Sequence, residues 1–175
     1  YSIWTNVLIR NHQKADAASE AVYSDCETYR YALTRLWGPG RRLAFVMLNP
    51  STATEMQNDP TVERCERRAR ALGYGGFRVV NLFAYRATDP AQLRKVADPV
   101  GPDNDATLTK AATWADTIIC GWGMHGGLHE RGAKIGTRLR ALGQDLHHLG
   151  LTKDGQPRHP LYVAYATLPQ IWTSP

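Results

Sequence analysis

The stretch Leu43-Ala-Phe-Val-Met-Leu-Asn-Pro50 decides the fold class. Its apolar residues run without a break from Leu43 to Leu48, which is typical of a strand buried on both faces of a parallel sheet. Asn49-Pro50 ends the run, because proline cannot continue a central strand. Comparable short runs predict three more strands, at 77–82, 117–122 and 145–149.

Helix signals lie between these runs. Asp59-Pro60-Thr61 combines an N-cap with a proline in the first turn, and predicts a helix over 61–72 that ends at Gly73. Further helices are predicted after Asp89-Pro90 and over 103–114 and 131–142. The alternation predicts a single α/β domain over residues 1–175, a three-layer α/β/α sandwich with a central, mostly parallel sheet. Before residue 43, only the alternating segment 29–37 predicts a strand, and a half-exposed one.

Composition limits the class of protein. The 175 residues, 43% of them hydrophobic, suit one well-buried core. No apolar run approaches membrane length and no secretory leader is visible, so a cytoplasmic protein is expected. Three scattered cysteines indicate reduced structural thiols, and Gly126-Gly127 between His125 and His129 argue against a metal pair on a helix. No nucleotide or cofactor motif is present, so no cofactor is expected.

The net charge is +5, and arginines crowd the segment 64–70. This pattern permits contact with phosphates, although a solvated helix face explains it at least as well.

Polar residues follow the predicted strands, where ligands of parallel sheets bind. Asn49, with Pro50 and Ser51, suits the positioning of a water or a substrate carbonyl. The alternative is an Asx-type turn with Asp59 as a helix cap.

Asn81 ends the second predicted strand and is followed by Phe83 and Arg86. An amide beside an aromatic ring could pair with a base edge while the ring stacks on its face. The alternative places Phe83 in the core.

Two further motifs follow predicted strands, one flanked by glycines and one by prolines. Gly121-Trp122-Gly123 reads as a structural turn. His159, held between Pro157 and Pro160, suits a fixed cationic or donor group near a reacting centre.

These motifs together resemble the family of unknown function DUF1643. The resemblance covers residues 43–163, through the stretches 47–53, 58–61, 80–88, 104–105, 122–123 and 155–163.

The order of the motifs is also similar, more distantly, to the uracil-DNA glycosylase superfamily. By that resemblance Asn49-Pro50 match the motif that orients the attacking water, Asn81 matches the residue that reads the flipped base, and His159-Pro160 match the late loop. Ser51 departs from the usual glycine or tyrosine, and Leu161 from the usual serine. Asparagine at position 49 resembles the mismatch-specific branch, and the branch with four cluster-binding cysteines is excluded by the cysteine count.

The resemblance implies a monomeric DNA glycosylase that flips a non-standard base, such as a phage-type modified pyrimidine, out of double-stranded DNA and leaves an abasic site, with a role in phage defence. It implies Asn49, Asp59 and His159 as catalytic residues and Phe83 or Tyr162 as stacking residues. Arg158 and Lys153 would grip DNA phosphates. Two alternatives stay open: a hydrolase or transferase of a free modified nucleotide, and a non-catalytic nucleic-acid-binding module.

Overall fold

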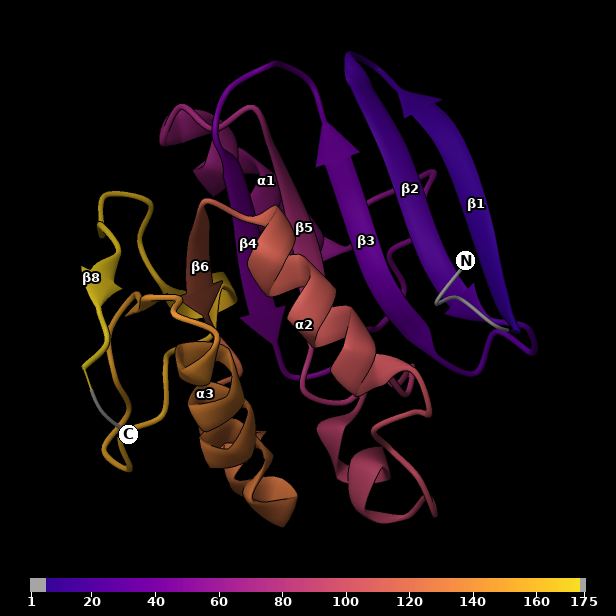
Figure 1. Cartoon of the computed structure of the whole chain (residues 1–175), viewed down its shortest axis with the longest axis vertical. Helices are drawn as coiled ribbons and strands as arrows, with labels where there is room; N and C mark the ends of the chain where they lie inside the picture. The colour runs from indigo at the N-terminus through magenta and orange to yellow at the C-terminus, as the bar shows by residue number, and fades with distance from the viewer. Residues whose placement is uncertain (1–5, 174–175) are drawn as a thin grey trace.

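The computed structural model describes residues 6–173 and is built around one eight-stranded sheet (Figure 1). The strand order is β1-β2-β3-β5-β4-β6-β7-β8. The strands are β1 (Val7–Lys14), β2 (Ala17–Ser24), β3 (Arg30–Leu36), β4 (Arg42–Met47), β5 (Gly76–Asn81), β6 (Thr117–Cys120), β7 (Leu146–His148) and β8 (Gln170–Ile171).

Helices cover both faces of the sheet. α1 (Pro60–Ala71) packs on one face, and α2 (Asn104–Trp114) and α3 (Arg131–Ala141) lie side by side on the other (Figure 1). Three short 3₁₀ segments complete the chain: η1 (Pro90–Arg94), η2 (Met124–Glu130) and η3 (Pro160–Tyr162). The predicted α/β class, with helices on both sides of a central sheet, is therefore correct for the described residues.

The apolar run of β4 is explained by this layering. Phe45 and Met47 pack in the cluster under α1, while Ala44 and Val46 pack in the cluster under α2 and α3. Successive side chains of a strand point to opposite faces, so a strand covered on both sides must be apolar throughout.

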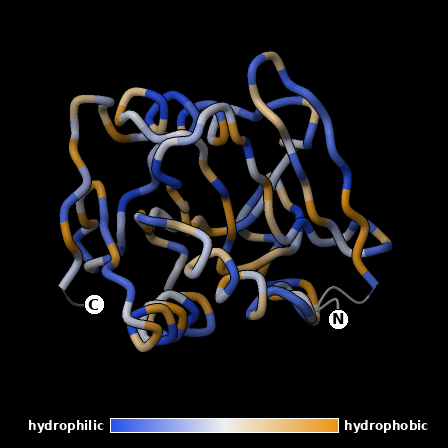
Figure 2. Tube along the Cα trace, turned by 45° about the horizontal axis from the view of Figure 1, so that its top comes forward, coloured by the Kyte–Doolittle hydropathy of each residue, from blue (hydrophilic) through white to orange (hydrophobic). Residues whose placement is uncertain are grey.

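The prediction of a mostly parallel sheet is wrong for the sheet as a whole. The central strands β5, β4, β6 and β7 are parallel to one another, but β1 to β3 run antiparallel, β3 joins β5 antiparallel, and β8 joins β7 antiparallel. The sheet is mixed because residues 7–36 contribute an antiparallel unit. β1 is an edge strand in which three apolar residues are followed by five hydrophilic ones, a change of colour that Figure 2 shows on the outer strand, so it carries little of the alternation that identifies a strand.

The segment 29–37 does form a strand, β3, but it is buried rather than half-exposed. Its polar residues Arg30, Thr34 and Arg35 are buried with it. The two arginines donate to carbonyl oxygens of the loop 53–54, and these bonds allow charged residues to occupy an interior strand.

The helix boundaries follow the predicted caps. The Asp59 carboxylate accepts from Val62 N at 2.9 Å, which is an N-cap bond, and Gly73 adopts a positive φ of 82° just past the end of α1. All three cysteines are free, with Cys65 and Cys120 buried. Between residues 6 and 173 no helix is both long and apolar enough to cross a bilayer.

Candidate functional site

A small pocket lies where the parallel strands β4 and β5 end. The register pairs Met47 with Asn81, so the two strands stop level with each other. The volume of the pocket is about 40 Å³, close to the ~30 Å³ that one water occupies in the liquid. Its lining residues are Arg30, Met47, Asn49, Pro50, Ser51, Asp59, Thr61, Val62, Val79, Asn81 and His159.

Strand alternation brings the two asparagines to one face. Met47 and Val79 both point towards α1. Asn49 and Asn81 each lie two positions further along the chain, so they point to the same face of the sheet. Asp59 begins α1 above them. The structure therefore gathers six of the predicted residues around one pocket: Asn49, Pro50, Ser51, Asp59, Asn81 and His159.

The Asn49 amide is oriented by its neighbours. Its Nδ2 donates to Pro50 O at 3.0 Å and to Ala87 O at 2.8 Å. Because both amide hydrogens are used, Oδ1 is the atom left to meet a ligand, and it can only accept. An acceptor in this position suits the orientation of a water through one of its hydrogens.

The Asn81 amide is buried without partners. The residue is 1% exposed, and within the described part of the chain neither Oδ1 nor Nδ2 makes a hydrogen bond. Leaving a buried donor or acceptor unsatisfied costs about 1–3 kcal/mol, so proteins rarely retain such groups without a function. A free donor and a free acceptor side by side match the edge of a nucleobase.

The Asp59 carboxylate serves the backbone and the pocket together. One oxygen caps α1 through Val62 N, and the other accepts from Ala53 N at 3.2 Å. These bonds fix the carboxylate at the wall of the pocket while each oxygen keeps a further lone pair. Asp59 can therefore both cap the helix α1 and serve as a polar group of the pocket.

His159 enters the pocket as a neutral donor. Its Nδ1 accepts from Leu161 N at 3.2 Å, so the ring proton sits on Nε2. Burial lowers the pKa of His159, and the nearby Asp59 opposes this only in part. Of the two expected forms, cationic group or donor, the structure therefore favours the donor at neutral pH.

The loop that carries His159 rests directly on the end of β6. A Cβ added at Gly121 would lie 2.8 Å from Pro160 Cδ, closer than packed atoms allow. Gly123, with a positive φ of 71°, donates to Pro157 O at 2.8 Å. The motif Gly121-Trp122-Gly123 is structural, as expected, and its task is to seat the histidine loop.

Arg30 is a pocket residue that the sequence reading missed. It begins β3, is 1% exposed, and lines the pocket beside the two asparagines. Burial lowers its pKa to about 10, with Asp59 acting in the opposite direction, so it remains a cation at neutral pH. A charged residue in an otherwise buried strand was the signal that could have revealed it.

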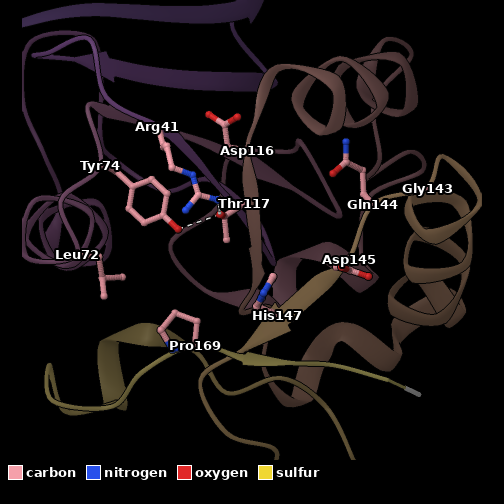
Figure 3. A pocket seen from close by; sticks show the side chains of 10 residues that line it. All are labelled: Arg41, Leu72, Tyr74, Asp116, Thr117, Gly143, Gln144, Asp145, His147 and Pro169. Atoms are coloured by element: carbon pink, nitrogen blue, oxygen red, sulfur yellow. Dashed lines mark hydrogen bonds between the residues drawn. The ribbon is translucent and has the colours of Figure 1, made fainter.

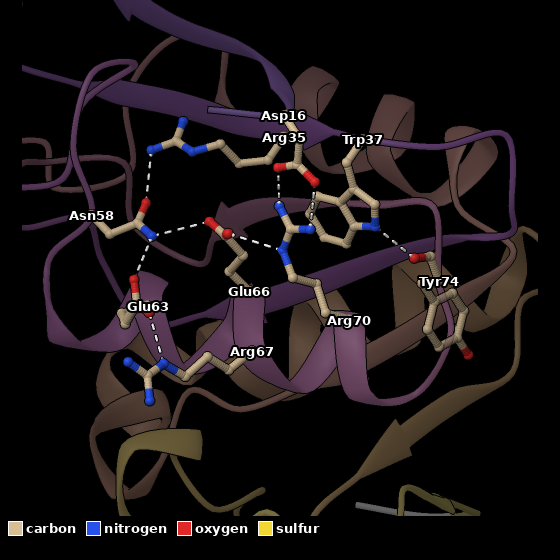
Figure 4. Close-up of polar contacts among 9 residues, drawn as sticks. All are labelled: Asp16, Arg35, Trp37, Asn58, Glu63, Glu66, Arg67, Arg70 and Tyr74. Atoms are coloured by element: carbon tan, nitrogen blue, oxygen red, sulfur yellow. Dashed lines mark hydrogen bonds and ion pairs between the residues drawn. The ribbon is translucent and has the colours of Figure 1, made fainter. Parts of the chain in front are cut away.

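A polar network anchors the loop before α1 (Figure 4). Arg35 donates to Asn58 Oδ1 at 2.9 Å, and Asn58 Nδ2 donates to Glu63 at 2.9 Å and to Glu66 at 3.1 Å. Glu66 in turn pairs with Arg70. The network fixes Asn58, and with it the neighbouring Asp59.

Several predicted residues lie outside the pocket. Phe83 is fully buried in the core cluster on the α2 and α3 side, so its alternative assignment is the one observed. Arg86 donates to Glu27 O at 3.3 Å and lies over the Tyr23 ring. Neither residue lines this pocket.

The exposed residues of the late loop surround His159. Tyr162 is 74% exposed, and its ring centroid lies 5.8 Å from that of His159. Arg158 and Lys153 are exposed on the same loop. These three do not line the pocket but lie on the loop that carries His159.

The arginines of α1 are mostly occupied within the protein. Arg68 is buried and donates to three carbonyls of the segment 163–167, and Arg64 donates to Val163 O. Arg67 and Arg70 pair with Glu63 and Glu66 of the same helix. The cluster is therefore neither a simple solvated face nor a free phosphate-binding set.

A larger cavity of about 500 Å³ lies at the other end of the central parallel strands (Figure 3). Its polar groups are already engaged with one another: the Tyr74 hydroxyl and Arg41 both donate to Thr117 Oγ1, at 2.8 and 3.2 Å, and His147 Nδ1 lies 3.1 Å from Ile118 O. It also faces the amino ends of the parallel strands, whereas ligands of such sheets bind at the carboxyl ends. The small pocket is the stronger candidate.

The fold and the pocket together define an α/β protein with a polar pocket at the carboxyl ends of the parallel strands β4 and β5. The chain belongs to the family described as protein of unknown function DUF1643, whose model matches residues 30–161. Comparison with curated proteins and with solved structures gave no significant match.

Proposed function

We propose that this protein is a DNA glycosylase that removes a non-standard or modified pyrimidine and leaves an abasic site. The observation that carries the proposal is the buried, unpartnered amide of Asn81 in the pocket that also holds Asn49, Asp59 and His159. The resemblance of these motifs to the uracil-DNA glycosylase superfamily supports the same assignment. A uracil-DNA glycosylase-like arrangement, a monomer and a cytoplasmic role in phage defence are parts of this proposal.

Each pocket group has a task in hydrolysis of an N-glycosidic bond. Asn81 pairs with the base edge, and the Nε2–H of His159 donates to a base oxygen on which negative charge develops. Asn49 Oδ1 orients a water towards the sugar carbon. The glycosidic bond breaks with its electron pair on the base, the water oxygen bonds to the sugar carbon, and the water proton passes to Asp59 before it reaches the departed base.

The size of the pocket sets a condition on substrate entry. At about 40 Å³ it is far below the ~300–1,000 Å³ of sites that hold small organic ligands. We expect the loop that carries His159, the one part of segment 150–162 that lines the pocket, to move away from the ends of β4 and β5 when a flipped base enters. Exposed Arg158 and Lys153 lie on that loop, where DNA phosphates would meet them as it opens.

The test is incubation with DNA duplexes that differ only in one base: uracil, a mismatched thymine, or a hypermodified phage pyrimidine. Alkali then cleaves at each abasic site, and gel electrophoresis detects the fragments. The wild-type protein is expected to cut at least one of these duplexes. Asn81→Ala and Asn49→Ala should lower the rate about 100-fold or more. Thr113→Ala, an exposed change on α2, should not.

Failure to form abasic sites on every duplex would refute the proposal. Turnover of free modified mononucleotides without cutting of DNA would favour the alternative, a nucleotide hydrolase or transferase.

A further inference from the structure

Arg30 differs from the other buried arginines in how its guanidinium is used. Arg35 and Arg68 each make three hydrogen bonds, which tie loop oxygens to the sheet or to α1. Arg30 makes one within the described chain, from Nη1 to Ala53 O at 2.9 Å. Arg30 is thus anchored by a single bond and keeps most of its donors free.

The charge of Arg30 also lacks a direct ion pair. Among residues 6–173, no carboxylate forms an ion pair with it, although it is only 1% exposed. Asp59 in the same pocket attracts the guanidinium, but it offsets the cost of burial only in part, because the pKa of Arg30 stays lowered. Incomplete compensation of a buried cation is costly, and a further negative group that arrives during function would complete it. Arg30 lines the pocket, so that negative group is expected there.

The other pocket groups cannot supply positive charge. His159 is a neutral donor, the two asparagines are uncharged, and Asp59 is an acid. Arg30 is therefore the cation of this pocket. An enzyme that releases a base with the bonding electron pair must offset the negative charge on that base, and a fixed cation beside the base can do this.

We propose that Arg30 is a catalytic residue that contacts the excised base and stabilises its anion as the glycosidic bond breaks. This inference rests on the proposed function. The electron pair of the broken bond moves to the base, Arg30 keeps its proton and acts through its charge, and the base takes its proton from the water that has added to the sugar. A base anion, rather than a DNA phosphate, is the ligand because Arg30 shares the pocket with the Asn81 amide that meets the base edge.

The test uses a free base and does not require turnover. 5-Nitrouracil is a pyrimidine whose ring N–H ionises in the working pH range and whose absorbance reports its ionisation. Titration of the probe with and without excess protein gives its pKa in the two states. The wild-type protein should lower the pKa of the probe by about 1–3 pH units, as a nearby opposite charge does.

Variants assign the effect to Arg30. Arg30→Gln should lose most of the lowering, and Arg30→Lys, which keeps the charge, should retain part of it. Arg78→Gln is the matched control, because Arg78 is a partly buried arginine on β5 that bonds Thr34 and stacks on Trp114 away from the pocket. It should leave the pKa of the bound probe unchanged.

The outcomes separate this inference from the proposed function. An unchanged probe pKa with wild-type protein, or equal lowering by wild type and Arg30→Gln, would overturn the role of Arg30 even if abasic sites form. Lowering that depends on Arg30, without abasic sites on any duplex, would support a pyrimidine-anion site and refute the glycosylase. Displacement of the probe by inorganic phosphate at equal concentration would assign Arg30 to phosphate and overturn the inference.

Discussion

Replacing Asn81 with leucine should stabilise the fold while it destroys the site. Both polar atoms of the Asn81 side chain are buried and unsatisfied, and each such group costs about 1–3 kcal/mol. Leucine has the same branching at Cγ, and the adjoining cavity of about 40 Å³ takes up its extra volume. With a discount for crowding, the free energy of unfolding should rise by about 1–3 kcal/mol, which corresponds to an increase in Tm of roughly 2–12 °C for a chain of this length.

Urea and thermal unfolding measure this change, and the abasic-site assay measures activity on the same preparations. Asn104→Leu is the control, because Asn104 Nδ2 donates to the backbone oxygens of Asn81 and Leu82 at 2.9 and 3.0 Å. Losing these bonds should destabilise the protein. If Asn81→Leu were also destabilising, by more than about 1 kcal/mol, Asn81 would be a satisfied structural residue and the central observation of the proposed function would be lost.

Three further changes probe the surroundings of the pocket. Gly121→Ala should lower the free energy of unfolding by about 1–3 kcal/mol and lower the activity, because the added Cβ pushes the His159 loop away. Gly127→Ala, whose added Cβ has no atom within 4 Å, should leave the stability nearly unchanged. Urea unfolding compares the two variants. Arg35→Met should destabilise the fold by on the order of 3 kcal/mol, because it frees buried acceptors in the loop before α1; equal unfolding midpoints would contradict this. Burial lowers the pKa of His159, so below pH ~6.5 the unfolded chain binds a proton before the folded chain does, and the free energy of unfolding falls as the pH falls. Burial also lowers the pKa of His148. In urea unfolding at several pH values, His159→Gln should therefore lose only the part of this pH dependence that is due to His159.

The sequence predicted the central part of the fold because its signals are local. The continuous apolar run of β4 and the Asp59-Pro60 cap each specify an element within a few residues, and both were found at the expected place. Placing the polar residues at strand ends needed only the rule that parallel strands end at the same edge of the sheet. Asn49, Asn81 and His159, which are far apart in the chain, meet for this reason.

The remainder depends on contacts that no local pattern records. β1 carries polar residues on an exposed edge, and β8 has only two residues, so neither shows a strand period. Arg30 and Arg35 look like surface residues until the loop carbonyls that they bind are placed beside them. From the sequence alone, Phe83 could face the pocket or the core. It faces the core, because it packs in the cluster under α2 and α3.

The buried arginines change what the net charge of +5 means for the encounter with a polyanion. Arg30, Arg35, Arg68 and Arg131 lie inside the protein, so four of the cations behind that figure cannot contact the phosphates of a duplex that approaches from solution. Fewer counterions are then released on binding than the number of basic residues alone implies. Affinity should consequently vary only shallowly with salt concentration, and discrimination among targets should arise after contact, when a base is tried in the pocket, rather than during the approach.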